Sequence, residues 1–213
     1  MEWPILAGMP EEDVRRVLQI ARRRTFGRRE VVFHRGDPAD TLHLVHSGRF
    51  GVRIGTRWGD TVMLNLLGPG ETFGEIALLD DTAPRSATIV AVEASETRAI
   101  HKVDFDALRA RHPNVSDILA TALALRVRRL SELLVEAHYE PADARVLRRV
   151  AELADGEGGV VPLTQEELSN LAGTSRATVN RVLREAQARG EVELRRGRIA
   201  VLDGPGLASR VTI

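Results

Sequence analysis

The feature that most constrains this chain is a run of short β-rich segments between residues 28 and 102. The segments are rich in valine, leucine, isoleucine and phenylalanine, and they are Val31–Phe33, Leu42–Val45, Phe50–Ile54, Val62–Leu67 and Ala87–Val92. Glycine- or proline-containing turn signals separate them at Arg35–Pro38, Ser47–Gly48, Trp58–Asp60 and Gly68–Gly70. Strands that recur at this pace predict a small antiparallel sandwich or barrel.

The longest helical pattern follows these strands, over residues 114–138. Its apolar positions alternate steps of three and four residues, at Ala120, Leu123, Val127, Leu130, Leu134 and Ala137. A seam of this kind is what a two-stranded coiled coil requires, although it could also pack on its own domain. Other apolar residues of the helix are free for packing within the chain, namely Ile118, Leu119, Ala122, Leu125 and Leu133. We therefore expect a homodimer formed through residues 114–138.

Shorter helices are expected on both sides of the strands. Helical spacing predicts one over Met9–Arg24 and another from Asp104 to Arg111, which Pro113 would stop. The segment Glu140–Asp143 interrupts the long helical pattern and is the best candidate for a hinge.

Beyond the hinge, the pattern is that of a winged helix-turn-helix. A helix is expected over Ala144–Ala154, and Thr164–Glu167 has the spelling of a capping box that opens the next helix. Gly173 suits the tight turn, and Ser175–Ala188 predicts a second helix with an apolar inner face at Val179, Val182 and Leu183. Residues 191–195 and 198–202 predict a hairpin. Between residues 174 and 198 lie seven arginines and three glutamates, a local excess of positive charge in a chain with 30 basic and 30 acidic residues.

A second cluster of functional groups lies in Phe73–Leu79 and Pro84–Thr88. There Glu75, Arg85 and Ser86 surround a glycine turn, and together they suit a small anion that carries a phosphodiester and a sugar hydroxyl. A small-ligand pocket in the same chain as a DNA-binding motif predicts a transcription regulator that the ligand controls.

In this order and spacing, the motifs resemble the CRP/FNR family of bacterial transcription regulators, which includes the cyclic AMP receptors. The resemblance runs from Phe26 to about Val201 and includes Gly36–Asp37, Gly68–Gly70, the glutamate–arginine cassette and Thr174–Arg181. It implies an α+β fold with an N-terminal cyclic-nucleotide-binding β-roll, jelly-roll-like, over residues 1–113. A dimerisation helix and hinge would follow over 114–140, and a C-terminal winged helix-turn-helix DNA-binding domain over 141–213.

The same resemblance implies a ligand, cyclic AMP (cAMP), and the residues that hold it. Arg85 would pair with the phosphate, Ser86 would donate to it, and Glu75 would accept from the ribose hydroxyl. The residues expected around the ligand are Val52, Leu64, Gly74, Glu75, Ile76, Ala77, Arg85, Ser86, Leu130 and Ser131. Leu130 departs from the threonine of the cyclic AMP receptors, and losing that bond to adenine would cost about 1 kcal/mol. The alternative is an Arg85–Glu75 ion pair that ties down a loop and holds no ligand.

For DNA, the resemblance implies that Arg176 and Arg181 read bases while Ser175, Thr164 and the wing arginines contact phosphates. The expected DNA-binding residues are Thr164, Ser175, Arg176, Ala177, Thr178, Asn180, Arg181 and Arg196. Ala177 replaces a glutamate of the cyclic AMP receptors, and its methyl group cannot accept from cytosine. The operator is therefore expected to be two-fold symmetric, with guanines retained and a changed preference opposite Ala177.

Composition excludes several other classes of protein. The chain has no cysteine, so disulfides, thiolate catalysis and cysteine-ligated iron–sulfur clusters are ruled out. His43 and His46 would point to opposite faces of a strand, and we expect neither a metal nor haem. No apolar run reaches the roughly 20 residues of a membrane span, and a cytoplasmic protein without membrane contact is expected.

Several alternatives remain at this point. A CRP-fold regulator could be active without a ligand or could sense a different small molecule, and a regulatory subunit could act through protein contacts alone. From another class, an enzyme that metabolises cyclic nucleotides is the main rival, but the chain lacks a recognisable catalytic constellation and we expect no enzyme. RNA polymerase is a further candidate partner.

Overall fold

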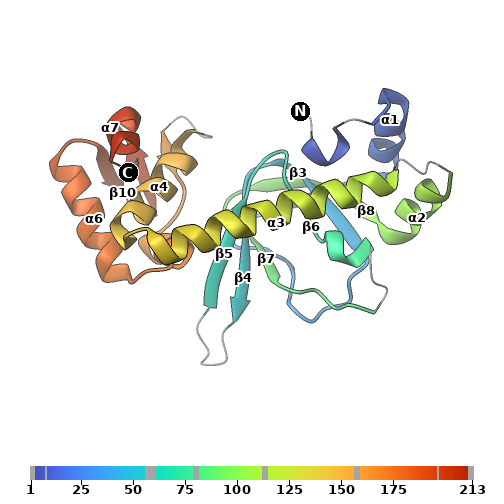
Figure 1. The fold of residues 1–213 in the computed structure, drawn as a ribbon, viewed down its shortest axis with the longest axis horizontal. Coiled ribbons are helices and arrows are strands. Elements are labelled where there is room, and N and C mark those ends of the chain that lie inside the picture. The colour runs from blue at the N-terminus through green and yellow to red at the C-terminus, as the bar shows by residue number, and fades with distance from the viewer. Residues whose placement is uncertain are drawn as a thin grey trace. The chain divides into compact units, whose positions relative to one another are not determined.

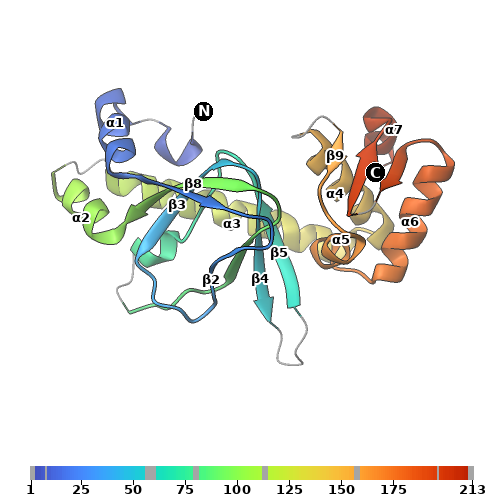
Figure 2. The same cartoon turned by 180° about the vertical axis from the view of Figure 1, so that it is seen from behind.

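The computed structural model describes residues 3–7, 9–55, 61–78, 82–111, 115–155, 159–195 and 197–210 (Figures 1 and 2). The expected turn at Trp58–Asp60, the helix stop at Pro113 and the DNA-binding residue Arg196 lie outside these ranges, and so do the side chains of Ala77 and Ile118. The chain divides into two compact units, residues 1–54 with 65–130 and residues 55–64 with 131–213.

Strands β1 to β8 form two four-stranded sheets with the orders β1-β8-β3-β6 and β2-β7-β4-β5. Strand β3 pairs antiparallel with β8, and β4 pairs antiparallel with β7. The two sheets agree with the antiparallel sandwich or barrel that the strand pattern predicts and with the β-roll that the family resemblance implies. The strands are β1 Arg22–Phe26, β2 Val31–Phe33, β3 Thr41–Ser47, β4 Phe50–Gly55, β5 Thr61–Leu67, β6 Thr72–Phe73, β7 Thr88–Ala91 and β8 Ser95–His101.

Strand β1 corrects the expected helix over Met9–Arg24. The helix, α1, is shorter and covers Glu11–Ile20, because Arg22–Phe26 pairs residue by residue with β8. Four of the five residues of β1 are exposed, so its charged sequence carries no β signal of its own. Long-range pairing overrides the local pattern here.

Strand β3 supports two cores because successive side chains point to opposite faces. Leu42 and Leu44 belong to a cluster with residues of α1 and of α2, the helix Lys102–Arg111. Val45 belongs to the other cluster, which includes the phenylalanines at 26, 50 and 73 and fills the roll. Helix α2 begins two residues before Asp104, the start expected from the sequence.

Helix α3 is the long helix and covers Val115–Tyr139 without a break (Figure 1). Leu119 is buried and Ala122 packs against the first core, as expected for intrachain packing. Leu125, from the same expected set, is 46% exposed. The seam residues Leu130 and Leu134 are 51% and 60% exposed. No helix in the described ranges has both the length and the apolar character needed to cross a membrane.

The second unit contains the expected winged helix-turn-helix. Its elements are α4 Ala142–Asp155, β9 Val160–Val161, α5 Gln165–Ala172, α6 Arg176–Ala188, β10 Val192–Arg195, β11 Arg198–Val201 and α7 Gly204–Ser209. The inner face of α6 is buried as the pattern predicts, with Val179, Val182 and Leu183 all under 2% exposed. Strand β9 extends the wing hairpin to a three-stranded sheet, and neither it nor α7 was expected.

Candidate functional site

A cleft on the β-roll gathers most of the expected ligand-binding residues. It encloses about 410 Å³ when the space open to solvent is counted. Six expected residues line it: Val52, Gly74, Glu75, Ile76, Arg85 and Ser86. The other lining residues are Phe33, Ala39, Phe73, Pro84, Ala87, Ile89 and Arg126.

Arg85 is the central group of this cleft, and its side chain is only 4% exposed. Its terminal nitrogens donate to Thr41, one to the carbonyl oxygen at 2.8 Å and one to Oγ1 at 2.6 Å. The guanidinium carbon lies 4.0 Å from the centroid of the Phe33 ring, a cation–π contact. The guanidinium is therefore held in one orientation by groups outside the expected set.

The charge of Arg85 is only partly compensated. Its carboxylate partner is Asp40 at 3.6 Å, an aspartate that is itself 71% exposed. Glu75 is not among its ion-pair partners in the described residues, so the alternative Arg85–Glu75 pair is not formed. Within the same residues, the buried Nε of Arg85 has no hydrogen-bond partner. Burial lowers the pKa of Arg85 while Asp40, Asp37 and Glu75 raise it, but an arginine still keeps its charge. These groups fit a small anion.

Gly74 allows Arg85 to lie where it does. Its φ is +87°, and a Cβ built there would lie 2.5 Å from the carbonyl oxygen of Thr41 and 2.7 Å from Nη1 of Arg85. A side chain at this position would therefore collide with the backbone and displace the guanidinium.

We expect Gly74→Ala to destabilise the protein and to weaken ligand binding together. Gly36 is a matched control because its φ is +92° and a Cβ there would meet nothing within 4 Å. Gly36→Ala should cost only the backbone strain, about 1–2 kcal/mol. Gly74→Ala should cost at least about 1 kcal/mol more because of the collision. Denaturant unfolding of both variants measures the difference, and equal losses would contradict the steric account.

His43 lies behind the cleft in the interior of the roll. Its ring stacks on Phe73 at a centroid distance of 4.8 Å, and its Nδ1 lies 3.0 Å from Oγ1 of Thr97. Burial first, and then the charges of Arg85, Arg24 and His101, lower the pKa of His43 to about 3. No group of three or more potential metal ligands is found in the described ranges. His43 is thus a neutral packing residue.

The protein should lose stability as the pH falls below about 6.5, because His43 has a pKa near 6.5 when unfolded and about 3 when folded. The unfolded chain takes up the proton first, so the contribution is complete above pH 6.5. At pH 5 the loss should be about 2 kcal/mol. Urea unfolding at pH 7.5, 6.5 and 5 would measure it. His43→Phe should remove this component, whereas replacing the exposed His34 by glutamine should leave it unchanged.

Three expected ligand residues, Leu64, Leu130 and Ser131, do not line the cleft among the described residues, and the side chain of Ala77 lies outside them. Leu64 on β5 is 43% exposed and does not line the cleft, and Ala77 lies in the single-turn helix η2 over Glu75–Leu78. Leu130 and Ser131 are exposed on α3 and do not line it either. Arg126 does, and it could have been found from its position one helical turn before Leu130.

The helix-turn-helix is built from local caps. Thr164 accepts from the N–H of Glu167, whose carboxylate accepts from the N–H of Thr164, so the expected capping box is complete. Gly173 closes the turn in the left-handed conformation with φ +60°. Ser175 caps α6 by accepting from the N–H of Thr178 at 3.1 Å. These contacts fix how α6 follows α5.

The outer face of α6 carries the expected DNA-reading residues. Arg176, Ala177, Asn180 and Arg181 are exposed, and Thr178 is half-buried. Asn180 donates to Oε1 of Gln165 at 3.1 Å. Arg181 is engaged by two carboxylates, Asp143 at 2.6 Å and Glu185 at 3.1 Å.

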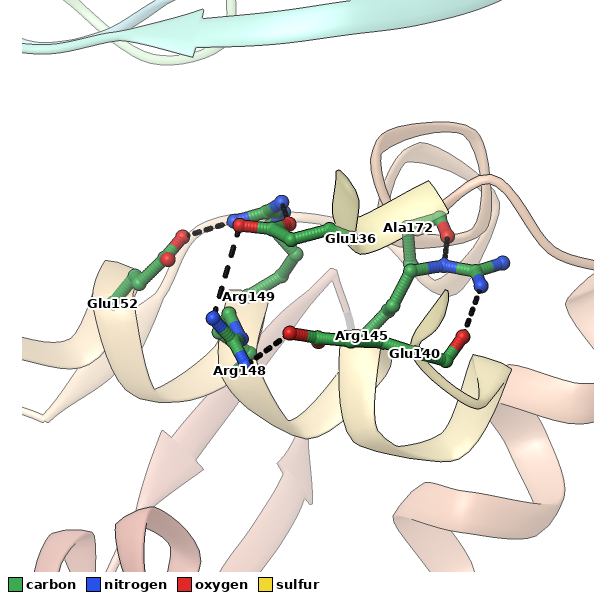
Figure 3. A network of polar contacts seen from close by, with 7 residues as sticks. All are labelled: Glu136, Glu140, Arg145, Arg148, Arg149, Glu152 and Ala172. Atoms are coloured by element: carbon green, nitrogen blue, oxygen red, sulfur yellow. Dashed lines mark hydrogen bonds and ion pairs between the residues drawn. The ribbon is translucent and has the colours of Figure 1, made fainter. Parts of the chain in front are cut away.

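A polar network joins the end of α3 to α4 within the second unit (Figure 3). Arg149 pairs with Glu136, and both residues are buried. Arg148 pairs with Glu140 at 2.6 Å and approaches Glu136 at 3.8 Å. Removing one partner of a buried ion pair leaves an uncompensated charge, so the network opposes separation of these helices. Ion pairs therefore connect the two sides of the expected hinge at Glu140–Asp143.

Arg145 connects the polar network between α3 and α4 to the helix-turn-helix. Its guanidinium donates to the carbonyl oxygen of Glu140 at 2.7 Å and to those of Ala172 and Gly173 at 3.0 Å each. Figure 3 shows the first two contacts converging on one side chain. These carbonyls end α3 and α5, where helices leave acceptors without partners. One side chain therefore satisfies both helix ends.

Comparison with known proteins gives two family matches. Residues 23–112 match the cyclic nucleotide-binding domain, and residues 128–210 match the Crp-like helix-turn-helix domain. The chain is 39% identical over 202 residues to the cyclic AMP receptor protein of Thermus thermophilus, covering 93% of this chain and 92% of that protein. It is 35% identical over 198 residues to the CRP-like cAMP-activated global transcriptional regulator of Mycobacterium tuberculosis, covering 87% and 86% of the two chains. The crystal structure of Thermus thermophilus catabolite activator protein aligns with a TM-score of 0.57, at 36% identity and 98% coverage of both chains.

Proposed function

This chain belongs to the CRP/FNR family of transcription regulators, and from that membership we propose that it is a homodimeric regulator controlled by cAMP. It combines a cyclic nucleotide-binding domain with a helix-turn-helix DNA-binding domain. The similar protein of Mycobacterium tuberculosis is named as a transcriptional regulator, and with its Crp-like helix-turn-helix domain this chain is a regulator and not an enzyme.

The observation that carries the ligand proposal is the buried guanidinium of Arg85 in its cleft. It is oriented by Thr41 and Phe33, its partner Asp40 is exposed, and its Nε is free among the described residues. A cyclic phosphate would supply the missing acceptor, and the planar fork of arginine suits two phosphate oxygens. Glu75 lines the same cleft and would accept from the ribose hydroxyl, and Ser86 would donate to the phosphate.

The names of the two similar regulators support cAMP as the cyclic nucleotide. Val52 would form part of the apolar wall beside the sugar and base. Leu130 cannot bond to the adenine amino group, so we expect weaker binding than a threonine there would allow. Ser131 would contact the base from the long helix of the second subunit.

Exposure of the α3 seam supports the homodimer. Val127, Leu130 and Leu134 are each more than half exposed, and they lie at coiled-coil spacing on one helix. Burying them against a second copy would remove this apolar surface from water. Ligand contact near Ser131 would then bias the packing of the seam, and the two reading helices would meet successive major grooves of a two-fold symmetric operator.

Calorimetric titration of the nucleotide-stripped protein with cAMP, and separately with cyclic GMP, tests the ligand. Selection from a random double-stranded DNA pool, with and without cAMP, tests the regulator. Micromolar binding of cAMP together with cAMP-dependent selection of a palindrome is the expected result. Selection of the same palindrome without nucleotide would favour a ligand-independent regulator. No selected DNA under either condition would overturn the proposal.

A further inference from the structure

Arg181 is held by two carboxylates that come from different helices. Its Nη2 donates to Oδ1 of Asp143 at 2.6 Å, and its Nη1 donates to Oε1 of Glu185 at 3.1 Å. Glu185 lies one turn further along the same helix, α6, whereas Asp143 lies in the first turn of α4. The side chain is nevertheless 52% exposed, so it is restrained and accessible at once.

The two contacts leave donors for a base. A guanidinium has five N–H hydrogens, and each terminal nitrogen of Arg181 has used one of its two. One hydrogen on each terminal nitrogen and the Nε hydrogen are left by these contacts. That is enough for a bidentate contact with O6 and N7 of a guanine. Arg181 could therefore read a base without leaving its carboxylate partners.

The backbone of Asp143 is positioned by contacts that do not involve Arg181. It lies two residues before Arg145, which ties α4 to the carbonyl oxygens of Ala172 and Gly173 at the turn before α6. The position of Asp143 beside α6 thus depends on bonds that do not involve Arg181. A rotamer-rich side chain restrained in advance loses less freedom when it binds.

We propose that Asp143 is a positioning residue for Arg181, which orders the guanidinium for guanine before the protein meets DNA. This inference rests on the proposed function and on the role given there to Arg181. If Asp143 has this role, recognition of the base at one operator position depends on α4, the helix that the polar network connects to α3.

The test compares base preference at every operator position. The operator is the one that wild-type protein selects from a random double-stranded pool, and each position is then changed to the other three bases. Arg181→Ala identifies the position that Arg181 reads by losing preference there alone. We expect Asp143→Asn to reduce the guanine preference at that same position by about fivefold and to change other positions by less than about twofold.

Two further variants separate positioning from charge and from folding. Glu193→Gln removes another carboxylate that pairs with an arginine of the helix-turn-helix unit, Arg195 at 2.7 Å. It should change affinity for all sequences alike and leave every preference intact, because it does not contact Arg181. Asp143→Glu keeps a carboxylate and should retain most of the guanine preference, which a merely structural role would not require.

The outcomes distinguish this inference from the proposed function. An unchanged guanine preference in Asp143→Asn would overturn it. So would an increased preference, because Asp143 would then compete with the base. If Arg181→Ala altered no position, the proposed base-reading role of Arg181 would fail instead, while selection of an operator would still stand.

Discussion

Replacing Arg85 by alanine is expected to lower the affinity for cAMP by about a hundredfold or more. The guanidinium is buried, and Thr41 and Phe33 set its orientation before a ligand binds. Losing one partner of a buried, hydrogen-bonded charge pair costs about 2–5 kcal/mol. Calorimetric titration of the nucleotide-stripped variant with cAMP measures the loss.

Two variants make the Arg85 result specific. Arg28→Ala removes an exposed arginine in the turn after β1, and it should leave the affinity unchanged. Arg85→Lys keeps the charge but loses the planar fork, so its affinity should lie between those of the wild type and the alanine variant. Wild-type affinity in Arg85→Ala would mean that cAMP binds elsewhere or is not the ligand.

Leu134→Glu is expected to dissociate the proposed dimer and, with it, to abolish strong operator binding. Leu134 is on the seam, so the substitution would place two carboxylates in the centre of a coiled coil. Loss of the two buried leucines and burial of charge should raise the dimer dissociation constant by more than about a thousandfold. Sedimentation equilibrium measures the dissociation constant, and a fluorescence titration measures operator binding.

The neighbouring residue supplies a control for the Leu134 prediction. Val135 is 58% exposed, against 60% for Leu134, but it lies off the seam. Val135→Glu introduces the same charge into the same helix and should leave the dimer intact. If both variants behaved alike, the effect would come from the helix itself and the seam would not be the interface.

Local signals predicted those parts of the fold that depend on neighbours in sequence. The capping box at Thr164–Glu167, the left-handed Gly173 and the inner face of α6 all involve residues a few positions apart. Five strands were also visible as short apolar runs. Strand β8 was missed because it has the polar sequence Ser95–His101, although Thr97 is fully buried at the centre of its sheet. Its burial comes from pairing with β1 and β3 on either side.

The candidate ligand site also combines residues that the sequence predicted with contacts that only the fold reveals. The sequence predicted that Glu75 and Arg85 lie together because only a short helical turn and a loop separate them along the chain. The groups that orient Arg85 were not, since Thr41 lies 44 residues away. Likewise Asp143 lies 38 residues before Arg181. Single polar contacts over such separations have no periodicity, so only the fold reveals them.

The caps of the helix-turn-helix have a consequence for how sharply the regulator can be switched. Thr164, Gly173 and Ser175 make their contacts within residues 164–178 and need no ligand. The proposed effector would therefore not have to fold the helix-turn-helix, and it would act on the balance between folded states of the protein. Changing occupancy from 1:99 to 99:1 requires about 10⁴-fold tighter binding to the active state. With a smaller ratio, transcription would persist without ligand or stay incomplete at saturation, and control at the promoter would then be graded.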